Sequence, residues 1–112
     1  MIVADTNLIA YFVIPGARTE SAERVRSKDR NWIAPTLLRS ELLNVLAKYI
    51  ARGILDRDEA SKAFHRGISL VKFSNLESEP FDTFNLCHAG DSAPYDAEFV
   101  WLAIKLRIPL VT

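Results

Sequence analysis

The sequence is poor in cysteine, histidine and glycine, and each shortage excludes a kind of site. Among 112 residues there are one cysteine, two histidines and four glycines. Cys87 has no second cysteine to pair with, so an internal disulfide is excluded and the chain suits a reducing compartment. His65 and His88 lack the spacing of a zinc site. The glycines are isolated, and none belongs to a phosphate-binding loop.

The chain also lacks long hydrophobic runs. No segment approaches the ~20 apolar residues that are needed to span a bilayer. The first residues do not combine a basic region, a long apolar stretch and a small-residue cleavage site, which a secretory signal would require. We therefore expect a cytoplasmic protein with no membrane partner.

An excess of charge of one sign is absent as well, since 14 basic residues balance 14 acidic ones. Binding of a polyanion would therefore need a local cluster of cations. One cluster exists between Arg18 and Arg30, a segment that contains five basic residues and three acids. A solvated helix face with internal charge pairing explains this segment equally well.

Four short apolar runs alternate with longer segments of helical periodicity. The runs are Ile2 to Ala4, Trp32 to Ala34, Leu70 to Phe73 and Ile108 to Val111. Short runs that are apolar on both faces are typical of buried parallel strands, and their alternation with helices indicates βαβ units. We predict one domain over residues 1–112, of the α/β class, with a mainly parallel sheet between two helical layers.

Two predicted helices have clear apolar faces. The first, from Pro35 to about Arg52, presents Leu38, Leu42, Val45, Leu46 and Tyr49 at roughly 3.6-residue spacing. The second, from Pro94 to about Arg107, presents Phe99, Val100, Ala103 and Ile104. Further signals are Pro15-Gly16 as the end of a first short helix, Asp56 as the cap of a helix to about Arg66, and Pro80 as the start of another segment.

Three acids lie beside these elements. Asp5 ends the first strand, Glu41 lies on the shoulder of an apolar helix face, and Asp96 lies in the first turn of the last helix. Singly, Asp5 can be a helix cap, Glu41 a half-exposed residue, and Asp96 a partner of its helix dipole worth about 0.3–1 kcal/mol. Jointly, they follow elements that meet at one edge of a parallel sheet, where ligands bind.

Gathered carboxylates point to a cation. Within ~4 Å they would repel by about 4 kcal/mol at an effective dielectric constant of 20. A divalent ion removes that repulsion, and a ligand set of oxygens alone favours Mg²⁺ or Mn²⁺ over zinc. Such an ion activates water and neutralises charge on a phosphodiester, as in metal-assisted nucleases.

The blocks around these acids resemble the PIN domain family, and within it the VapC-type toxins of toxin-antitoxin systems. The likeness runs in order along the whole chain. It consists of Asp5-Thr6-Asn7, Ala34-Pro35, residues 38–46 around Glu41, residues 95–100 around Asp96, and the closing residues Ile108 to Thr112. The resemblance implies an α/β/α sandwich and a Mg²⁺- or Mn²⁺-dependent endoribonuclease. It also implies a dimer inhibited by an antitoxin that covers the acidic pocket.

By position, the resemblance implies that Asp5, Glu41 and Asp96 are catalytic metal ligands, directly or through water. Thr6 and Asn7 would support Asp5, and Thr112 would line the pocket. A small hydroxyl residue is usual two positions before the third acid, where this chain has Pro94, with Ser92 two residues earlier. For the implied homodimer, we expect an apolar contact formed by Leu46, Ile50, Ile54 and Leu55.

Family members usually carry a further acid shortly after the last threonine, and this sequence ends at Thr112. We therefore expect a sandwich without its last C-terminal elements, a second ion held less readily, and reduced or absent activity. The alternative is a catalytically silent PIN-like module that binds RNA or an antitoxin. A haloacid-dehalogenase-like phosphatase is disfavoured, because Asn7 stands where its second acid is required.

Overall fold

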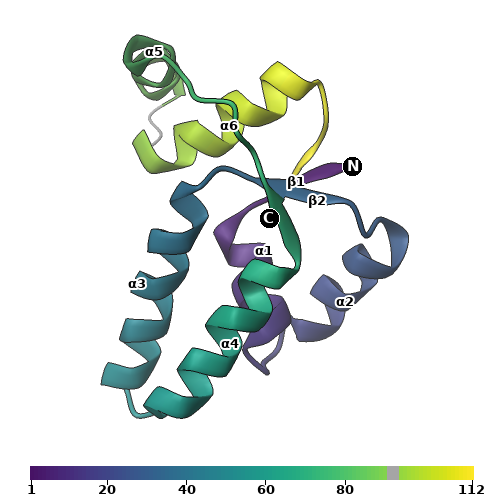
Figure 1. Cartoon of the computed structure of the whole chain (residues 1–112), viewed down its shortest axis with the longest axis vertical. Coiled ribbons are helices and arrows are strands. Elements are labelled where there is room, and N and C mark those ends of the chain that lie inside the picture. The colour runs from purple at the N-terminus through teal and green to yellow at the C-terminus, as the bar shows by residue number, and fades with distance from the viewer. Residues whose placement is uncertain (91–93) are drawn as a thin grey trace.

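The computed structural model describes the backbone of residues 1–90 and 94–112 and the side chains of residues 1–86 and 97–112. Helices and short strands alternate along these residues, as Figure 1 shows. The strands are β1 (Ile2–Ala4), β2 (Trp32–Ala34), β3 (Val71–Phe73) and β4 (Leu110–Val111). The helices are α1 (Thr6–Val13), α2 (Thr19–Lys28), α3 (Leu37–Ala51), α4 (Arg57–Ser69), α5 (Pro80–Gly90) and α6 (Pro94–Leu106).

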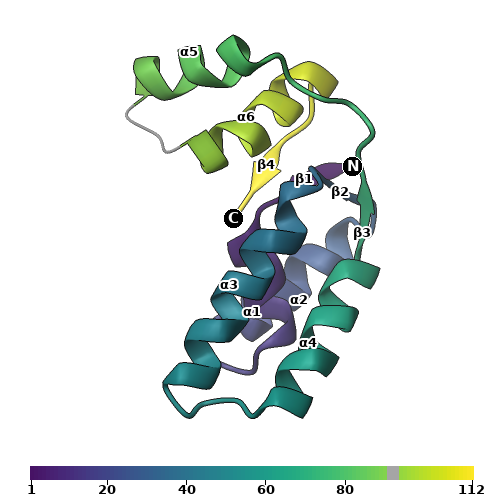
Figure 2. The same cartoon turned by 60° about the vertical axis from the view of Figure 1, so that its left-hand side comes forward.

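The four strands form a parallel sheet in the order β3-β2-β1-β4. Helices α5 and α6 lie on one side of the sheet, and α1, α3 and α4 lie on the other (Figures 1 and 2). This arrangement confirms the predicted α/β/α sandwich with a parallel sheet. Strands β2 and β3 lie on one side of β1, and β4 lies on the other side. The strand order therefore reverses at β1.

The central strands are buried, whereas the edge strands are not. All three residues of β1 and of β2 are buried. In β3 the side chain of Lys72 is exposed, and in β4 that of Leu110 is 36% exposed. The prediction of four buried strands is therefore wrong for the two edges. An apolar run does not reveal which strand has a neighbour on one side only.

Helices α1, α3 and α4 pack closely on one side of the sheet. Asp56 begins α4 with a capping box, since its side chain accepts from the Glu59 N–H and the Glu59 side chain accepts from the Asp56 N–H. Gly67 in α4 faces the core, where an added Cβ would lie 2.8 Å from Leu42 Cδ2 and 3.0 Å from Ile9 Cγ2. Only glycine allows α4 to approach α1 and α3 so closely.

The buried face of α6 differs from the predicted one. Phe99 and Ala103 are buried as predicted, but Ile104 is 61% exposed. Leu102, which was not on the predicted face, is 1% exposed. The helix is apolar on most of its circumference, so periodicity alone did not set its rotation; packing against β1 did. No helix within the described part of the chain is long and apolar enough to span a membrane.

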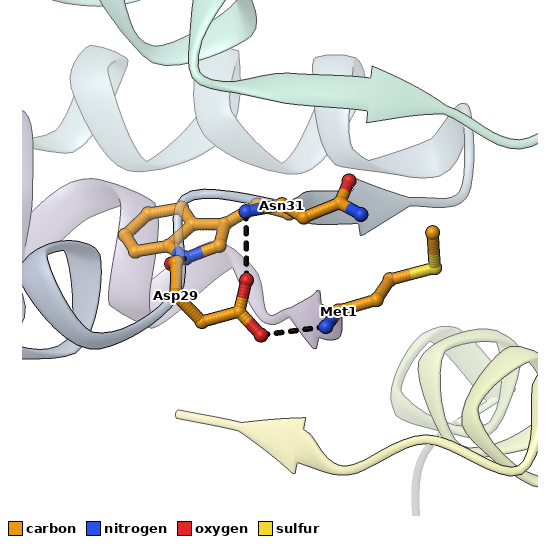
Figure 3. Close-up of polar contacts among 4 residues, drawn as sticks. Met1, Asp29 and Asn31 are labelled. Carbon is orange, nitrogen blue, oxygen red and sulfur yellow. Dashed lines mark hydrogen bonds and ion pairs between the residues drawn. The ribbon is translucent and has the colours of Figure 1, made fainter.

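Polar contacts tie the start of β1 to the start of β2, as Figure 3 shows. The Met1 amino group lies 2.5 Å from Asp29 Oδ2, and the Asn31 N–H donates to Asp29 Oδ1 at 2.8 Å. The hydrogen bond from the amino terminus, together with that from Asn31, holds the pKa of Asp29 below its usual value. These contacts hold the register in which Ile2 lies opposite Trp32.

Candidate metal site at the end of the first strand

Asp5 lies at the point where the strand order of the sheet reverses. It directly follows the fully buried Ala4, and its backbone N–H donates to the Val111 carbonyl of β4 at 3.0 Å. In open α/β sheets the crevice at this point, beyond the carboxyl ends of the strands, is where ligands bind. The backbone of the central strands thus places an acid at the expected position of a ligand site.

The carboxylate of Asp5 does not cap α1. Asp5 is the N-cap residue with an extended backbone, but its side chain makes no capping hydrogen bond. The carboxylate is half-buried and has no hydrogen bond or ion pair with any described residue. The simple alternative for this acid, a helix cap, is therefore not what the structure has.

A hydrogen bond connects Glu41 to the end of β1. The hydroxyl of Thr6 donates to Glu41 Oε1 at 2.9 Å. Thr6 is 5% exposed and Glu41 is half-buried. Glu41 is held in place because the next residue of α3, Leu42, is fully buried in the core. The helix acid therefore reaches the sheet edge, beside the residue that follows Asp5.

Thr6 has a different partner from the expected one. We expected it to support Asp5, whereas its single proton goes to Glu41. Asn7 is exposed, and no hydrogen bond joins its side chain to another described residue. The sequence could not indicate this partner of Thr6, because Glu41 is 35 residues away in the chain.

The third acid, Asp96, belongs to α6. The backbone of Asp96 belongs to the first turn of α6, but its side chain lies outside the described residues, and so does the whole of Ser92. Helix α6 packs against β1, and Ala97 in its first turn is fully buried. From Phe99 onward, α6 contributes Phe99, Leu102 and Ala103 to the core on the side of the sheet opposite α3.

Thr112 and Glu41 line different depressions. Thr112 lines a depression of about 220 Å³ between α1 and α2, together with Leu8, Tyr11 and Arg18 among others. Glu41 lines another depression, of about 260 Å³, with Leu37, Ser40 and Asn44. The structure therefore does not bring Thr112 into the depression that Glu41 lines.

The donor chemistry fits a hard divalent cation. Asp5 and Glu41 offer carboxylate oxygens, and Thr6 occupies one lone pair of Glu41 without adding charge. Among the side chains that the structure describes, no three histidine, cysteine or acidic residues lie close enough to hold a metal ion. Two carboxylates completed by water are sufficient for Mg²⁺, which commonly takes only one or two from the protein.

The basic segment from Arg18 to Arg30 forms α2 and its flanks. Arg24 lies 4.0 Å from Glu20 in an exposed pair, as the charge-pairing alternative predicted. Arg26 instead stacks on Trp32 at 4.8 Å and donates to the Leu70 carbonyl. Part of this positive charge therefore serves packing between α2 and the sheet.

A groove that the sequence did not reveal adjoins the depression of Glu41. It has a volume of about 570 Å³ and shares Leu37 and Ser40 with that depression. Ser78 and Glu98 form its far wall, where the Ser78 hydroxyl lies 3.1 and 3.2 Å from the two carboxylate oxygens of Glu98. No sequence signal joins these two residues, since they belong to different segments 20 positions apart.

Comparison with solved structures identifies the class of fold. The chain matches the crystal structure of VapC20 from Mycobacterium tuberculosis, described as a sarcin-ricin loop cleaving toxin, with a TM-score of 0.73. The match covers 96% of this chain and 85% of that one at 16% sequence identity. This likeness shows the fold, which is that of a PIN domain.

Comparison of sequences identifies the family. The chain is 31% identical over 117 residues to Ribonuclease VapC3 of Pyrobaculum aerophilum, and the alignment covers 99% of this chain and 87% of that protein. No family model matches the chain. The chain belongs to the VapC family of ribonucleases. The resemblance drawn from its three acidic blocks is thereby confirmed.

Proposed function

We propose that this protein is a Mg²⁺- or Mn²⁺-dependent endoribonuclease and the toxin of a toxin-antitoxin pair. Asp5, Glu41 and Asp96 would hold the ion, directly or through water. Membership of the VapC family supports the reaction, and the oxygen-only donors support the choice of metal. When bound, the ion would activate water and neutralise charge on the phosphodiester.

The observation that carries the proposal is the 2.9 Å hydrogen bond between Thr6 and Glu41. It joins α3 to the residue that follows Asp5, which supports a site that Asp5 and Glu41 share although they are 36 positions apart. Thr6 orients one oxygen of Glu41, and the burial of Leu42 in the core fixes the position of α3. The half-buried position of Asp5 reduces competition from water for its carboxylate.

The experiment is cleavage of a structured RNA with Mn²⁺ or Mg²⁺ by the wild type and by Asp5→Asn. We expect EDTA and Asp5→Asn each to abolish cleavage, because both remove the bound ion. Asp58→Asn is the matched control: Asp58 is an exposed acid of α4 that pairs with Lys62 at 3.1 Å, and its loss should leave cleavage unchanged. Cleavage that survives both EDTA and Asp5→Asn would overturn the proposal.

A thermal melt separates a silent module from an enzyme. A ligand that binds only the folded state stabilises it by RT ln(1 + [L]/Kd), which is about 2.7 kcal/mol at 100 times Kd. We expect Mn²⁺ to stabilise the wild type and not Asp5→Asn. If the metal neither stabilises the wild type nor supports cleavage, the protein binds partners without cutting RNA.

We further propose three features that the family implies. The RNA substrate meets the acidic edge of the sheet, and a protein antitoxin covers that edge. The protein acts in the cytoplasm as a homodimer. Asn7, Ser92 and Thr112 stay predicted supporting residues of the site.

A further inference from the structure

The charges of the sequence are divided unequally between the two sides of the sheet. Residues 74–104, which lead into α5 and form most of α5 and α6, contain six acids and no lysine or arginine. The rest of the chain carries all 14 basic residues and eight acids. Helices α5 and α6 lie on one side of the sheet, and α3 lies on the other (Figures 1 and 2). An RNA strand at the edge with Asp5 is therefore repelled by the α5–α6 side and attracted to the α3 side.

Several cations on the α3 side of the sheet serve contacts within the protein. Five of them pair with an acid or lie over an aromatic ring, namely Arg18, Arg24, Arg26, Lys62 and Arg66. Lys48 and Arg52 are exposed, and neither has an ion pair or ring contact with a described residue. Their charges are therefore available to a phosphate.

Helix α3 places these two cations on the same side as Glu41. Lys48 and Arg52 follow Glu41 by seven and eleven residues, and residues at either spacing lie within about 20° of each other around a helix. Arg52, the C-cap residue, keeps a helical backbone. The helix begins beside the sheet and runs away from it (Figures 1 and 2). Its rise places Lys48 about 10 Å and Arg52 about 16 Å beyond Glu41 along the axis.

A neutral polar surface connects Glu41 to Lys48. The depression of about 260 Å³ that Glu41 lines is also lined by Ser40 and Asn44. Asn44 is exposed and lies one turn from Glu41 and one turn from Lys48. Hydroxyl and amide groups donate to phosphate and ribose oxygens whatever the base. Because α3 carries no acid after Glu41, nothing on this side of the helix repels a strand that leaves the acidic edge.

We propose that the side of α3 formed by Asn44, Lys48 and Arg52 is a track for the RNA backbone, along which Lys48 and Arg52 bind consecutive phosphates beside the bond that is cut. The track rests on the proposed nuclease function, because it positions the strand at the acidic edge of the sheet. Ile50, expected in the homodimer contact, lies about 200° around the helix from Lys48, so the track stays open in the dimer.

The experiment measures how salt weakens the binding of single-stranded oligoribonucleotides to Asp5→Asn, in which cleavage is expected to be absent. Binding of phosphates releases counterions, so the logarithm of the binding constant falls with the logarithm of salt concentration, by about 0.7 for each phosphate bound in a single strand. We expect Lys48→Gln and Arg52→Gln, each added to Asp5→Asn, to reduce this slope by about 0.7. Strands of uridine and of adenosine should lose affinity equally, since phosphate contacts do not read bases.

Lys105→Gln is the matched control. It removes the same charge from an exposed lysine of α6, on the other side of the sheet, and should leave the slope unchanged. In the cleaving protein with Mn²⁺, Lys48→Gln should raise KM more than it lowers kcat, because a phosphate remote from the cut bond is held alike before and during the reaction. A thermal melt of each variant checks that it is folded.

The outcomes separate this inference from the proposed function. A salt slope that Lys48→Gln and Arg52→Gln leave unchanged, or that Lys105→Gln reduces equally, would overturn the track. Neither result would touch the nuclease, which is tested by metal-dependent cleavage and its loss in Asp5→Asn. Conversely, a slope that falls with the two α3 variants alone would establish the track even if no cleavage were found.

Discussion

At the scale of single residues, Thr6 shows how a side chain next to an acid can serve a different acid. Its hydroxyl is buried and donates to Glu41, so Asp5 and Glu41 are linked through the backbone of one dipeptide. The threonine thus supplies a neutral hydrogen-bond donor to a partly buried carboxylate.

Thr6→Val should weaken metal binding more than it weakens the fold. Valine keeps the shape of the side chain but removes the hydroxyl donor, so Glu41 loses the hydrogen bond that links α3 to the residue after Asp5. We expect a loss of about 1–3 kcal/mol in folding stability and a separate fall in Mn²⁺ affinity. Calorimetric titration with Mn²⁺ measures the affinity, and Thr6→Ser should restore it.

Thr83→Val is the matched control for Thr6→Val. Thr83 is also a buried threonine, 8% exposed, and its hydroxyl donates to the Pro80 carbonyl at 3.0 Å. Its substitution should lower stability by a similar amount and leave the Mn²⁺ affinity unchanged. If Thr6→Val and Thr83→Val changed the Mn²⁺ affinity equally, the role of Thr6 would be structural only.

At the scale of elements, the contact between α4 and α3 connects the core to the site. Gly67 lets α4 approach Leu42, the residue after Glu41 in α3. Gly67 has a normal helical backbone. It is needed for the space that its missing side chain leaves and not for a special conformation.

Gly67→Ala should destabilise the protein, although alanine is the better helix former. The added Cβ would lie 2.8 Å from a carbon of Leu42, and overpacking of this kind costs about 1–3 kcal/mol. Higher helix propensity offsets about 1 kcal/mol of that cost. We expect a net loss of about 1 kcal/mol, seen as a melting temperature lower by about 4 °C.

Gly16→Ala is the control for this prediction, because the nearest atom to its added Cβ is 3.9 Å away. Chemical denaturation of both variants gives the free energies of unfolding. If Gly67→Ala proved as stable as the wild type, Leu42 would have room to move, and the tight packing of α4 on α3 would not be a constraint on the site.

Helix ends and helix rotation differ in how well a sequence pattern predicts them. The cap at Asp56 and the ends of α1 and α3 were predicted because they depend on neighbours within four residues. The rotation of α6 was predicted wrongly at Ile104, because it depends on which of several apolar faces meets β1. Local signals determine where helices begin and end, and long-range packing determines how they turn.

At the scale of the whole molecule, the surface of α3 bears on the proposed homodimer. Leu46 was expected to contribute to the contact but is buried in the core, 3% exposed, so that expectation is wrong for this residue. Leu43, Ile50 and Ile54 are instead 53%, 37% and 55% exposed. Leu43 and Ile50, seven residues apart, lie on one side of α3, and Ile54 lies in the turn that follows the helix.

We expect the wild type to be dimeric and Ile50→Glu to be monomeric at micromolar concentration. A charge at position 50 would be buried without a partner in the dimer contact. Lys48→Glu, a change of charge at an exposed position of the same helix, is the control. Light scattering gives the masses. A monomeric wild type would remove the proposed homodimer and leave the nuclease proposal unaffected.

The sequence by itself determined the alternation of strands and helices, the family, and the three blocks that carry Asp5, Glu41 and Asp96. These features depend on local periodicity and on the order of residue types along the chain. Only the tertiary structure decided that Thr6 donates to Glu41, that Asp5 does not cap α1, and that Ser78 donates to Glu98 in the wall of a groove. The two hydrogen bonds join segments that are far apart in the sequence and that the parallel sheet brings to one edge. The spacing of residues along the chain does not indicate how close such segments lie in space.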